Sequence, residues 1–344
     1  MQPKRISWID VARGIGIILV IHGHSLSSES YRHLIYAFHM PLFFFISGLV
    51  FNYIRNDNLG LVIKKSAKGI LVPYVGFALF TYLIWLFQNN AFLSFDFSAF
   101  LNHMTGIIYG NSNRLFFNIV LWFLPVLFVT KVLFSFISKL KSEKIIAITL
   151  FIFSLIGYLI SVISPDIRLP FGVETALTAV VFFGAGSLLV TNPHPKLNDF
   201  VLRNKIILFA AASLISGIFA VVNYQNYGQQ IDLRLLHYGN YFYFYIAAIS
   251  GIVATLILGR IINTNRVLEY IGKYTLALFI FHPVVLFYAN KILAIFISMR
   301  VVDDIRDIYL SPFFTLISIG VILGVYYLGR RTGIYRLSKK LIRI

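Results

Sequence analysis

The stretch Asp10-Val-Ala-Arg13-Gly-Ile-Gly-Ile-Ile-Leu-Val-Ile-His22-Gly-His24 decides the fold class. It is apolar enough for a first membrane helix, yet it carries one arginine and two histidines, which hydrocarbon tolerates only at a cost. On a helix turning about 100° per residue, Arg13 and His24 lie about 20° apart on one face, whereas His22 points to the opposite side. We therefore expect a membrane helix that carries Arg13 near one surface and His24 about 16 Å deeper.

The composition indicates an integral membrane protein. Hydrophobic residues make up 58% of the chain and charged residues only 12%, against about 25% charged residues in soluble domains. The net charge of +17 does not predict a nucleic-acid partner, because the basic residues recur between apolar segments instead of clustering. The absence of cysteine excludes disulfides, thiolate zinc sites and a cysteine nucleophile.

Ten apolar stretches are long enough to span a bilayer, and they predict an all-α, polytopic membrane helix bundle. Lys4 and Arg5 precede the first stretch as in a signal peptide, but that stretch contains Arg13 and lacks a small-residue cleavage site, so we expect a retained helix. No loop is long enough for a separate soluble domain, which predicts one domain over residues 1–344. The expected spans are 9–27, 33–54, 68–88, 115–138, 144–163, 170–191, 205–223, 240–262, 273–297 and 311–329.

The lysines and arginines predict the orientation of these spans. If the N-terminus is cytoplasmic, the cytoplasmic loops and tails carry roughly three times as many lysines and arginines as the loops on the other side. Such a bias is typical of the cytoplasmic side of membrane proteins. With ten spans, we therefore expect both termini in the cytoplasm.

Several motifs together resemble the membrane-bound acyltransferase-3 family, and most of all its fucose 4-O-acetylase-like branch. They are the Asp10, Arg13 and His24 pattern, His39-Met-Pro-Leu-Phe-Phe-Phe-Ile-Ser-Gly48, Trp122-Phe-Leu, and Ile271-Gly-Lys-Tyr-Thr-Leu-Ala-Leu-Phe-Ile-Phe-His282. The resemblance covers nearly the whole chain. It implies a multi-pass O-acetyltransferase of the bacterial inner membrane, surrounded by membrane lipid. Such an enzyme moves acetyl from acetyl-CoA onto a sugar of a cell-surface or lipid-linked polysaccharide.

His24 is the strongest candidate for a catalytic residue, because imidazole is the usual general base at neutral pH. It would take the proton from a sugar hydroxyl as that oxygen attacks a thioester carbonyl. The alternative is a polar residue near the outer surface. His22, on the opposite side of the helix, is either a second hydrogen-bond donor or a packing residue.

Asp10 and Arg13 lie at the other end of the same helix. We assign Asp10 to the catalytic group with His24, although it lies too far along the helix to touch His24 and is expected to pair with Arg13. Arg13 either extends to the cytoplasmic headgroups or binds a phosphate of CoA, in a cofactor-binding role. The neighbouring Asp10 favours the second role.

Five further residues are candidates for contact with the acceptor: His39, Arg114, Trp122, Glu174 and His282. Pro41, two residues after His39, is expected to kink its helix and shape a cavity. Each of the five has an alternative role in a hydrogen bond that stabilises the bundle. Ser25 and Ser47 remain candidates for a covalent acyl intermediate, but no local motif supports either.

Other chemistries lack their motifs. The sequence has no Gly-Xaa-Ser-Xaa-Gly elbow, no phosphate-binding loop ending in Gly-Lys-Ser/Thr, and no His-Glu-Xaa-Xaa-His run. We expect acetyl-CoA as the co-substrate and no metal. The alternative function is a transporter of a sugar or small anion, because intramembrane ionisable residues also mark transport paths. Transporters often have paired halves, and the Arg13 and His24 arrangement has no counterpart in the second half of this chain.

Overall fold

The computed structural model describes residues 6–26, 31–51, 58–89, 96–140, 142–191, 195–296 and 306–331. Within these ranges the chain is helical, and its only extended pairing is an isolated bridge between Asp232 and His237. This confirms the predicted all-α fold. The longer helices are α1 (Ser7–Ser25), α3 (His39–Leu49), α5 (Val72–Gln88), α6 (Phe97–Tyr109), α7 (Phe123–Ile137), α8 (Glu143–Ile163), α9 (Val173–Thr191), α11 (Lys205–Tyr227), α12 (Tyr241–Ile262), α14 (Thr275–Phe296) and α16 (Ser311–Arg331).

Shorter helices connect these elements. They are α2 (Arg32–Tyr36), α4 (Leu59–Ser66), α10 (Pro195–Arg203) and α13 (Arg266–Lys273), together with 3-10 turns and the π-helical turns η1 (Ala67–Leu71) and η6 (Arg306–Leu310).

Eight helical stretches in the described residues are long and apolar enough to cross a membrane, so the chain is a polytopic membrane protein. They overlap the last eight of the ten expected spans, and the count of ten stays a prediction. The two termini, which the charge pattern predicts to be cytoplasmic, lie outside the described residues. The eight stretches are Leu59–Gln88, Ile119–Ile137, Glu143–Ile163, Pro170–Thr191, Lys205–Tyr227, Tyr241–Ile262, Thr275–Ile292 and Asp307–Gly329.

The first two expected spans have a different form from the rest. Helix α1 is 19 residues long but carries Asp10, Arg13 and two histidines, which lower its hydropathy. The described part of 33–54 is divided into α2 and α3, with the break at Ala37 and Phe38. Pro41 explains this break, because proline has no N–H to bond to the carbonyl of Ala37, and its ring crowds that carbonyl.

The third expected span begins earlier than the sequence indicated. The helix runs from Leu59 to Gln88 and includes the π-helical turn η1 in its middle. Pro73 follows this turn and cannot donate to the carbonyl of Gly69, so the wider turn accommodates the missing hydrogen bond without ending the helix.

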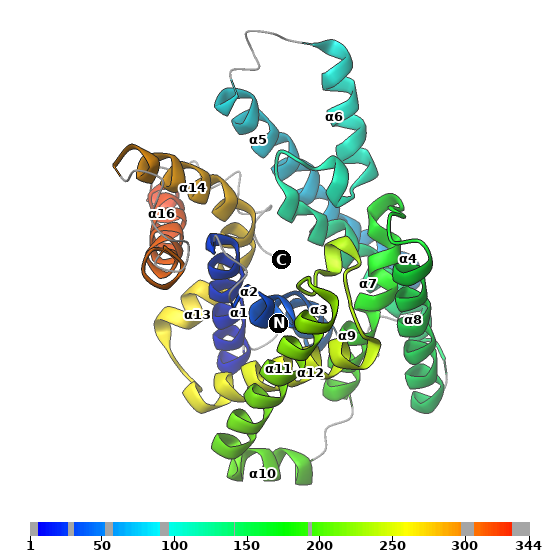
Figure 1. The fold of residues 1–344 in the computed structure, drawn as a ribbon. Helices are drawn as coiled ribbons and strands as arrows, with labels where there is room; N and C mark the ends of the chain where they lie inside the picture. Colours follow the sequence, from blue (N-terminus) through cyan, green and yellow to red (C-terminus); the bar gives the residue numbers. More distant parts are fainter. Residues whose placement is uncertain are drawn as a thin grey trace. The chain divides into compact units, whose positions relative to one another are not determined.

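The chain folds as two compact units. Unit 1 comprises Met1–Ile46, Asn192–Leu233 and His237–Arg336. Within it, α1 contacts α2, α12, α13, α14 and α16, and Figure 1 shows α1 beside α13, α14 and α16. Two glycines allow the close approach of α1 to α13, since a Cβ at Gly14 would overlap the carbonyl of Leu268 and one at Gly272 would overlap that of Asp10.

Unit 2 comprises Ser47–Thr191, Arg234–Leu236 and Leu337–Ile344. In its described part, α7 and α8 both pack on α9, and α4 packs on α7. Phe183 of α9 lies at the centre of an aromatic core, with ring centroids 5.4 Å from Phe51 and 5.5 Å from Phe134.

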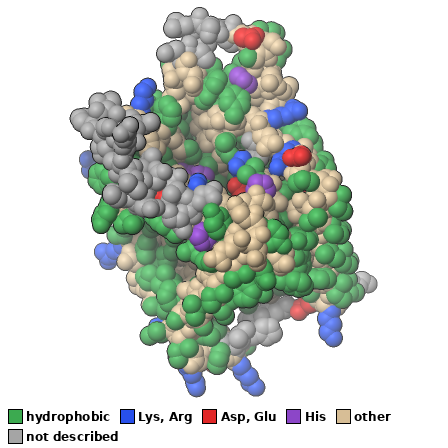
Figure 2. Space-filling model, in the orientation of Figure 1, with side chains coloured by type: hydrophobic (Ala, Val, Ile, Leu, Met, Phe, Trp, Pro, Cys, Tyr) green, Lys and Arg blue, Asp and Glu red, His purple; other side chains and the backbone are tan. Residues whose placement is uncertain are grey.

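Large apolar side chains cover the surfaces of both units, as expected for helices that face lipid. Ile163 of α8 is 75% exposed and Ile207 of α11 is 71% exposed. Figure 2 shows hydrophobic side chains over much of the face that it draws.

Candidate active site

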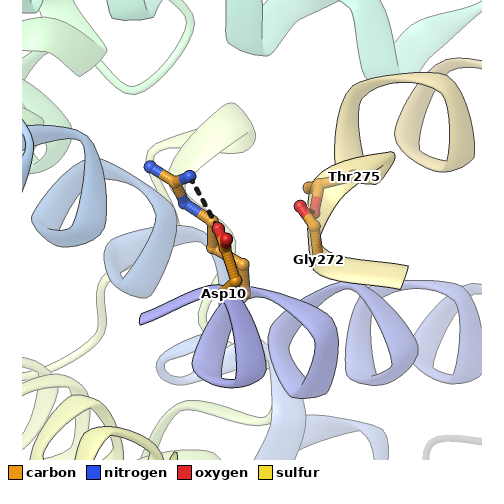
Figure 3. A network of polar contacts seen from close by, with 4 residues as sticks. Asp10, Gly272 and Thr275 are labelled. Atoms are coloured by element: carbon orange, nitrogen blue, oxygen red, sulfur yellow. Dashed lines mark hydrogen bonds and ion pairs between the residues drawn. The ribbon is translucent and has the colours of Figure 1, made fainter. Parts of the chain in front are cut away.

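The arginine of α1 is held by the carboxylate three residues before it. Arg13 Nη1 lies 3.4 Å from Asp10 Oδ1, and the Asp10 side chain is almost buried, whereas a quarter of the Arg13 side chain stays exposed. Figure 3 shows Asp10 on α1 opposite Gly272 and Thr275, which begin the turn into α14. The expected pair therefore forms, and it fixes the guanidinium while leaving part of it accessible.

The other end of α1 carries a cluster of histidines that come from three helices. His24 meets His282 of α14 edge-on, with ring centroids 5.0 Å apart, and stacks on Tyr36 of α2 at 6.0 Å. Tyr36 in turn lies 4.7 Å from His39 of α3. His39 and His282 both lie close enough to His24 that a positive charge on His24 would disfavour one on either of them.

Burial divides the roles within this cluster. His39 and His282 are 3% and 0% exposed, whereas His24 is an exposed residue. Of these three histidines, His24 is therefore the accessible one, and His39 and His282 are enclosed by other residues. In the described residues, no three His, Cys, Asp or Glu side chains are arranged to hold a metal ion.

The two buried histidines have the same hydrogen-bond pattern. His39 Nδ1 lies 3.0 Å from the carbonyl oxygen of Ile35, and His282 Nδ1 lies 3.1 Å from that of Leu278. A carbonyl oxygen only accepts, so in the neutral ring Nδ1 carries the hydrogen and Nε2 carries a lone pair. For His282, Nε2 is buried and has no hydrogen-bond partner among the described residues.

His22 belongs to a different network, on the opposite side of α1. Its Nδ1 lies 3.3 Å from the hydroxyl of Thr315 and its Nε2 lies 3.2 Å from that of Tyr31. Burial, together with the negative charge of Asp307, raises the pKa of Tyr31, so this phenol keeps its proton and donates to the Asp307 carbonyl. This geometry favours a structural role for His22, in which both ring nitrogens take part in hydrogen bonds away from His24.

Ser25 takes part in the same hydrogen-bond network. Its hydroxyl donates to the carbonyl of His22 at 2.7 Å, and its carbonyl accepts from the Ser311 hydroxyl at 2.9 Å. Ser25 is only 4% exposed. A buried hydroxyl that already donates to a backbone carbonyl is poorly suited to attack a thioester, so Ser25 is a structural residue.

The remaining candidates lie in unit 2, where Trp122 and Glu174 line a small cavity. Its volume is about 10 Å³, about the space that one water molecule needs. Glu174 is 1% exposed, and its Oε2 accepts a hydrogen bond from the backbone N–H of Leu169 at 3.0 Å. Arg114 does not line this cavity and lies instead over the ring of Tyr109, at 4.5 Å.

Asn111 and Arg234 also line this cavity, although sequence reasoning did not identify them. Asn111 is 4% exposed, and its Oδ1 has no hydrogen-bond partner in the part of the chain that the structure describes. The left-handed Gly110, which ends α6, was the only local sign of a special backbone here. Nothing in the local sequence pointed to Arg234, because it lies in a segment remote from the other lining residues.

A family model described as an acyltransferase domain, the acyltransferase-3 family, matches residues 6–331. No curated protein and no solved structure gave a match. The matched region includes the α1 pair, the histidine cluster and the cavity of unit 2. With its membrane-spanning helices and this match over nearly its whole length, the chain belongs to the acyltransferase-3 family and is a membrane acyltransferase.

Proposed function

We propose that this acyltransferase moves an acetyl group from cytoplasmic acetyl-CoA to a sugar hydroxyl of a cell-surface or lipid-linked polysaccharide. His24 is the general base in this proposal. The observation that supports it is the edge-on contact between the accessible imidazole of His24 and the buried imidazole of His282, whose Nε2 has no hydrogen-bond partner among the described residues. We place the enzyme in the inner membrane of a bacterium.

The transfer needs one base that later becomes an acid. His24 takes the proton of the sugar hydroxyl as the oxygen forms a bond to the thioester carbonyl carbon. When the carbon–sulfur bond breaks, the imidazolium returns that proton to the departing thiolate. Atoms and charge balance without a metal, a redox partner or a covalent intermediate on the protein.

In this mechanism His282 is a positioning residue. Its Nε2 has no hydrogen-bond partner among the described residues, and in the reacting complex its lone pair would accept from one nitrogen of His24, which leaves the other nitrogen to act as the base. The group that accepts this hydrogen bond is an imidazole and not a carboxylate. Asp10 lies about 21 Å away along α1 and pairs with Arg13. His39 supports the same cluster from α3.

Arg13 binds a phosphate of CoA in this proposal. A guanidinium forms bidentate, charge-assisted hydrogen bonds with phosphate, and Asp10 holds it in a fixed orientation. Helix α1 is unbroken from Ser7 to Ser25, so Arg13 and His24 share one face about 16 Å apart. The narrow pantetheine arm would then lead from the phosphates to the base.

In unit 2, Arg114, Trp122 and Glu174 stay predicted contacts of the sugar, whereas His39 and His282 are buried and support His24 instead. Trp122 offers an aromatic face and Glu174 a carboxylate that accepts from hydroxyl groups, which suit a sugar.

The test uses membranes that contain the protein and acetyl-CoA labelled in the acetyl group. The wild type should transfer label to polysaccharide, and surface polysaccharide from a deletion strain should lose an acetyl signal by NMR. A His24→Ala variant should lose transfer, whereas His33→Ala, a control histidine buried against Tyr224 at 4.6 Å, should keep it. Solute uptake without acyl transfer would contradict the proposal and favour a transporter.

A further inference from the structure

An apolar groove runs along the surface of unit 1 where α10, α11 and α12 meet. Its volume is about 350 Å³, within the range of small-ligand sites. Leu208 and Ile215 line it from α11, and Val253 and Ile257 line it from α12. The span from Leu208 to Ile215 is about 10 Å, a third of the hydrocarbon thickness.

One end of the groove is basic. Lys205 precedes Leu208 by three residues on α11, and Arg260 follows Ile257 by three residues on α12, so each cation is the next neighbour on its helix surface. The guanidinium of Arg260 lies 4.5 Å over the ring of Trp8. It also donates to the Asn198 side chain of α10, so its position at this end is fixed.

Helix α10 closes the same end. Its exposed Phe200 lines the groove, while Lys196 and Arg203 are exposed on the helix. A short helix with apolar and basic sides is typical of the membrane–water interface. With Lys205 and Arg260, this end has four basic side chains, and Asp199 is the acidic residue of α10.

We propose that this groove is a binding site for an anionic glycerophospholipid. One acyl chain lies between α11 and α12, and the phosphate lies at Lys205 and Arg260. The argument is charge complementarity: an apolar groove in a membrane protein is open to any lipid chain, but the cations at its interfacial end select a negative headgroup. The charge pattern of the whole sequence predicts that this end faces the cytoplasmic leaflet. The proposal is independent of the acetyl transfer proposed above.

The test is native mass spectrometry of the purified full-length chain, titrated with phosphatidylglycerol or phosphatidylcholine with identical acyl chains. The wild type should bind phosphatidylglycerol at least ten-fold more tightly. Each cation should contribute about five-fold, so Lys205→Gln should lower phosphatidylglycerol affinity about five-fold and Lys205→Gln with Arg260→Gln about 25-fold. Affinity for phosphatidylcholine should fall by less than about two-fold, because its choline offsets the charge of the phosphate.

Two further variants test the apolar part and the position. Ala212→Phe fills the groove and should lower the affinity for both lipids. Lys144→Gln, at the start of α8 in unit 2, is the control and should leave both affinities unchanged. Equal wild-type affinity for the two lipids, or unchanged phosphatidylglycerol binding in the double variant, would overturn the proposal. So would an Ala212→Phe variant that binds lipid normally but loses self-association. The lysine variant leaves the apolar contacts intact, so it decides the question even if Ala212→Phe does not fold.

Discussion

The tautomers of the buried His39 and His282 are set by backbone carbonyls one helical turn before them. Ile35 and Leu278 each accept from Nδ1 of the histidine four residues later. This bond is local, and it leaves Nε2 of His282 as the nitrogen that can accept a further hydrogen bond. In the proposed mechanism, two imidazoles take the place that a histidine and a carboxylate take in many hydrolytic triads.

The first prediction concerns His282. We expect His282→Phe to lower the turnover rate of acetyl transfer about ten- to hundred-fold, because the His24 imidazolium loses a hydrogen bond to its charged form. The KM for acetyl-CoA should stay within about two-fold of the wild type. His282→Gln, whose amide oxygen can accept, should recover much of the rate in steady-state kinetics.

The NMR shifts of the ring nitrogens give a readout for His282 that does not depend on activity. In protein labelled with ¹⁵N-histidine, His282 Nε2 should resonate as an unprotonated nitrogen. A proton on Nε2 would disprove the positioning role even if acetyl transfer is confirmed. Equal loss of rate in the Phe and Gln variants would also disprove it.

The second prediction concerns Arg13. Because a hydrogen bond to a charged phosphate contributes about 1.5–3 kcal/mol, Arg13→Ala should raise the KM for acetyl-CoA about ten- to hundred-fold. The KM of the Arg13→Lys variant should lie between those of the wild type and the alanine variant, because lysine keeps the charge but cannot form the bidentate pair. The measurement is the rate against acetyl-CoA concentration at fixed acceptor. An unchanged KM in the alanine variant would mean that Arg13 serves the headgroups instead.

At the scale of elements, the position of α1 depends on its contact with α13. Gly14 and Gly272 sit where the two backbones meet, and neither position has room for a Cβ. Small residues are common where membrane helices cross. The hydrophobic effect contributes little between helices already in lipid, so their association depends on close packing. The contact places the Asp10 and Arg13 turn against the entry to α14.

The third prediction follows from this crossing. Gly272→Ala should destabilise the protein by about 1–3 kcal/mol, because the added methyl group forces α1 and α13 apart. Gly320→Ala on α16, where a Cβ would meet nothing within 4 Å, is the control and should leave stability unchanged or slightly raised. Thermal unfolding in detergent measures both. Equal midpoints for the two variants would refute the packing argument.

At the scale of the whole molecule, the alternation of apolar helices and basic loops predicts the path through the membrane. Eight stretches of the described residues meet the requirements for spanning, and the predicted count of ten needs α1 and the α2–α3 segment as two further crossings. An even number of crossings places both termini on the same side of the membrane. Labelling of the loops can test this topology.

The fourth prediction tests this topology with single cysteines, which is practical because the chain has none of its own. Asp199→Cys precedes α11 and Gln229→Cys follows it, and both positions are exposed. In intact cells a membrane-impermeant thiol reagent should label the cysteine at position 229 only. In permeabilised cells both should react. The reverse pattern in intact cells would invert the proposed orientation.

The sequence by itself determined the membrane class and the geometry within α1. Apolar runs of spanning length have one stable form in lipid, where each backbone group needs an internal partner. The angle between Arg13 and His24 depends only on the helical repeat, so it could be read from spacing. The same local rule explains why Asp10 pairs with Arg13.

Only the tertiary structure decided which histidines come together and which residues line the cavity of unit 2. His282 reaches His24 because α14 packs beside α1, and no periodicity within either helix contains that contact. The cavity of unit 2 likewise unites Asn111, Glu174 and Arg234 from three separate segments. Spacing along one helix is fixed by covalent geometry, but the meeting of helices depends on side-chain packing over the whole bundle.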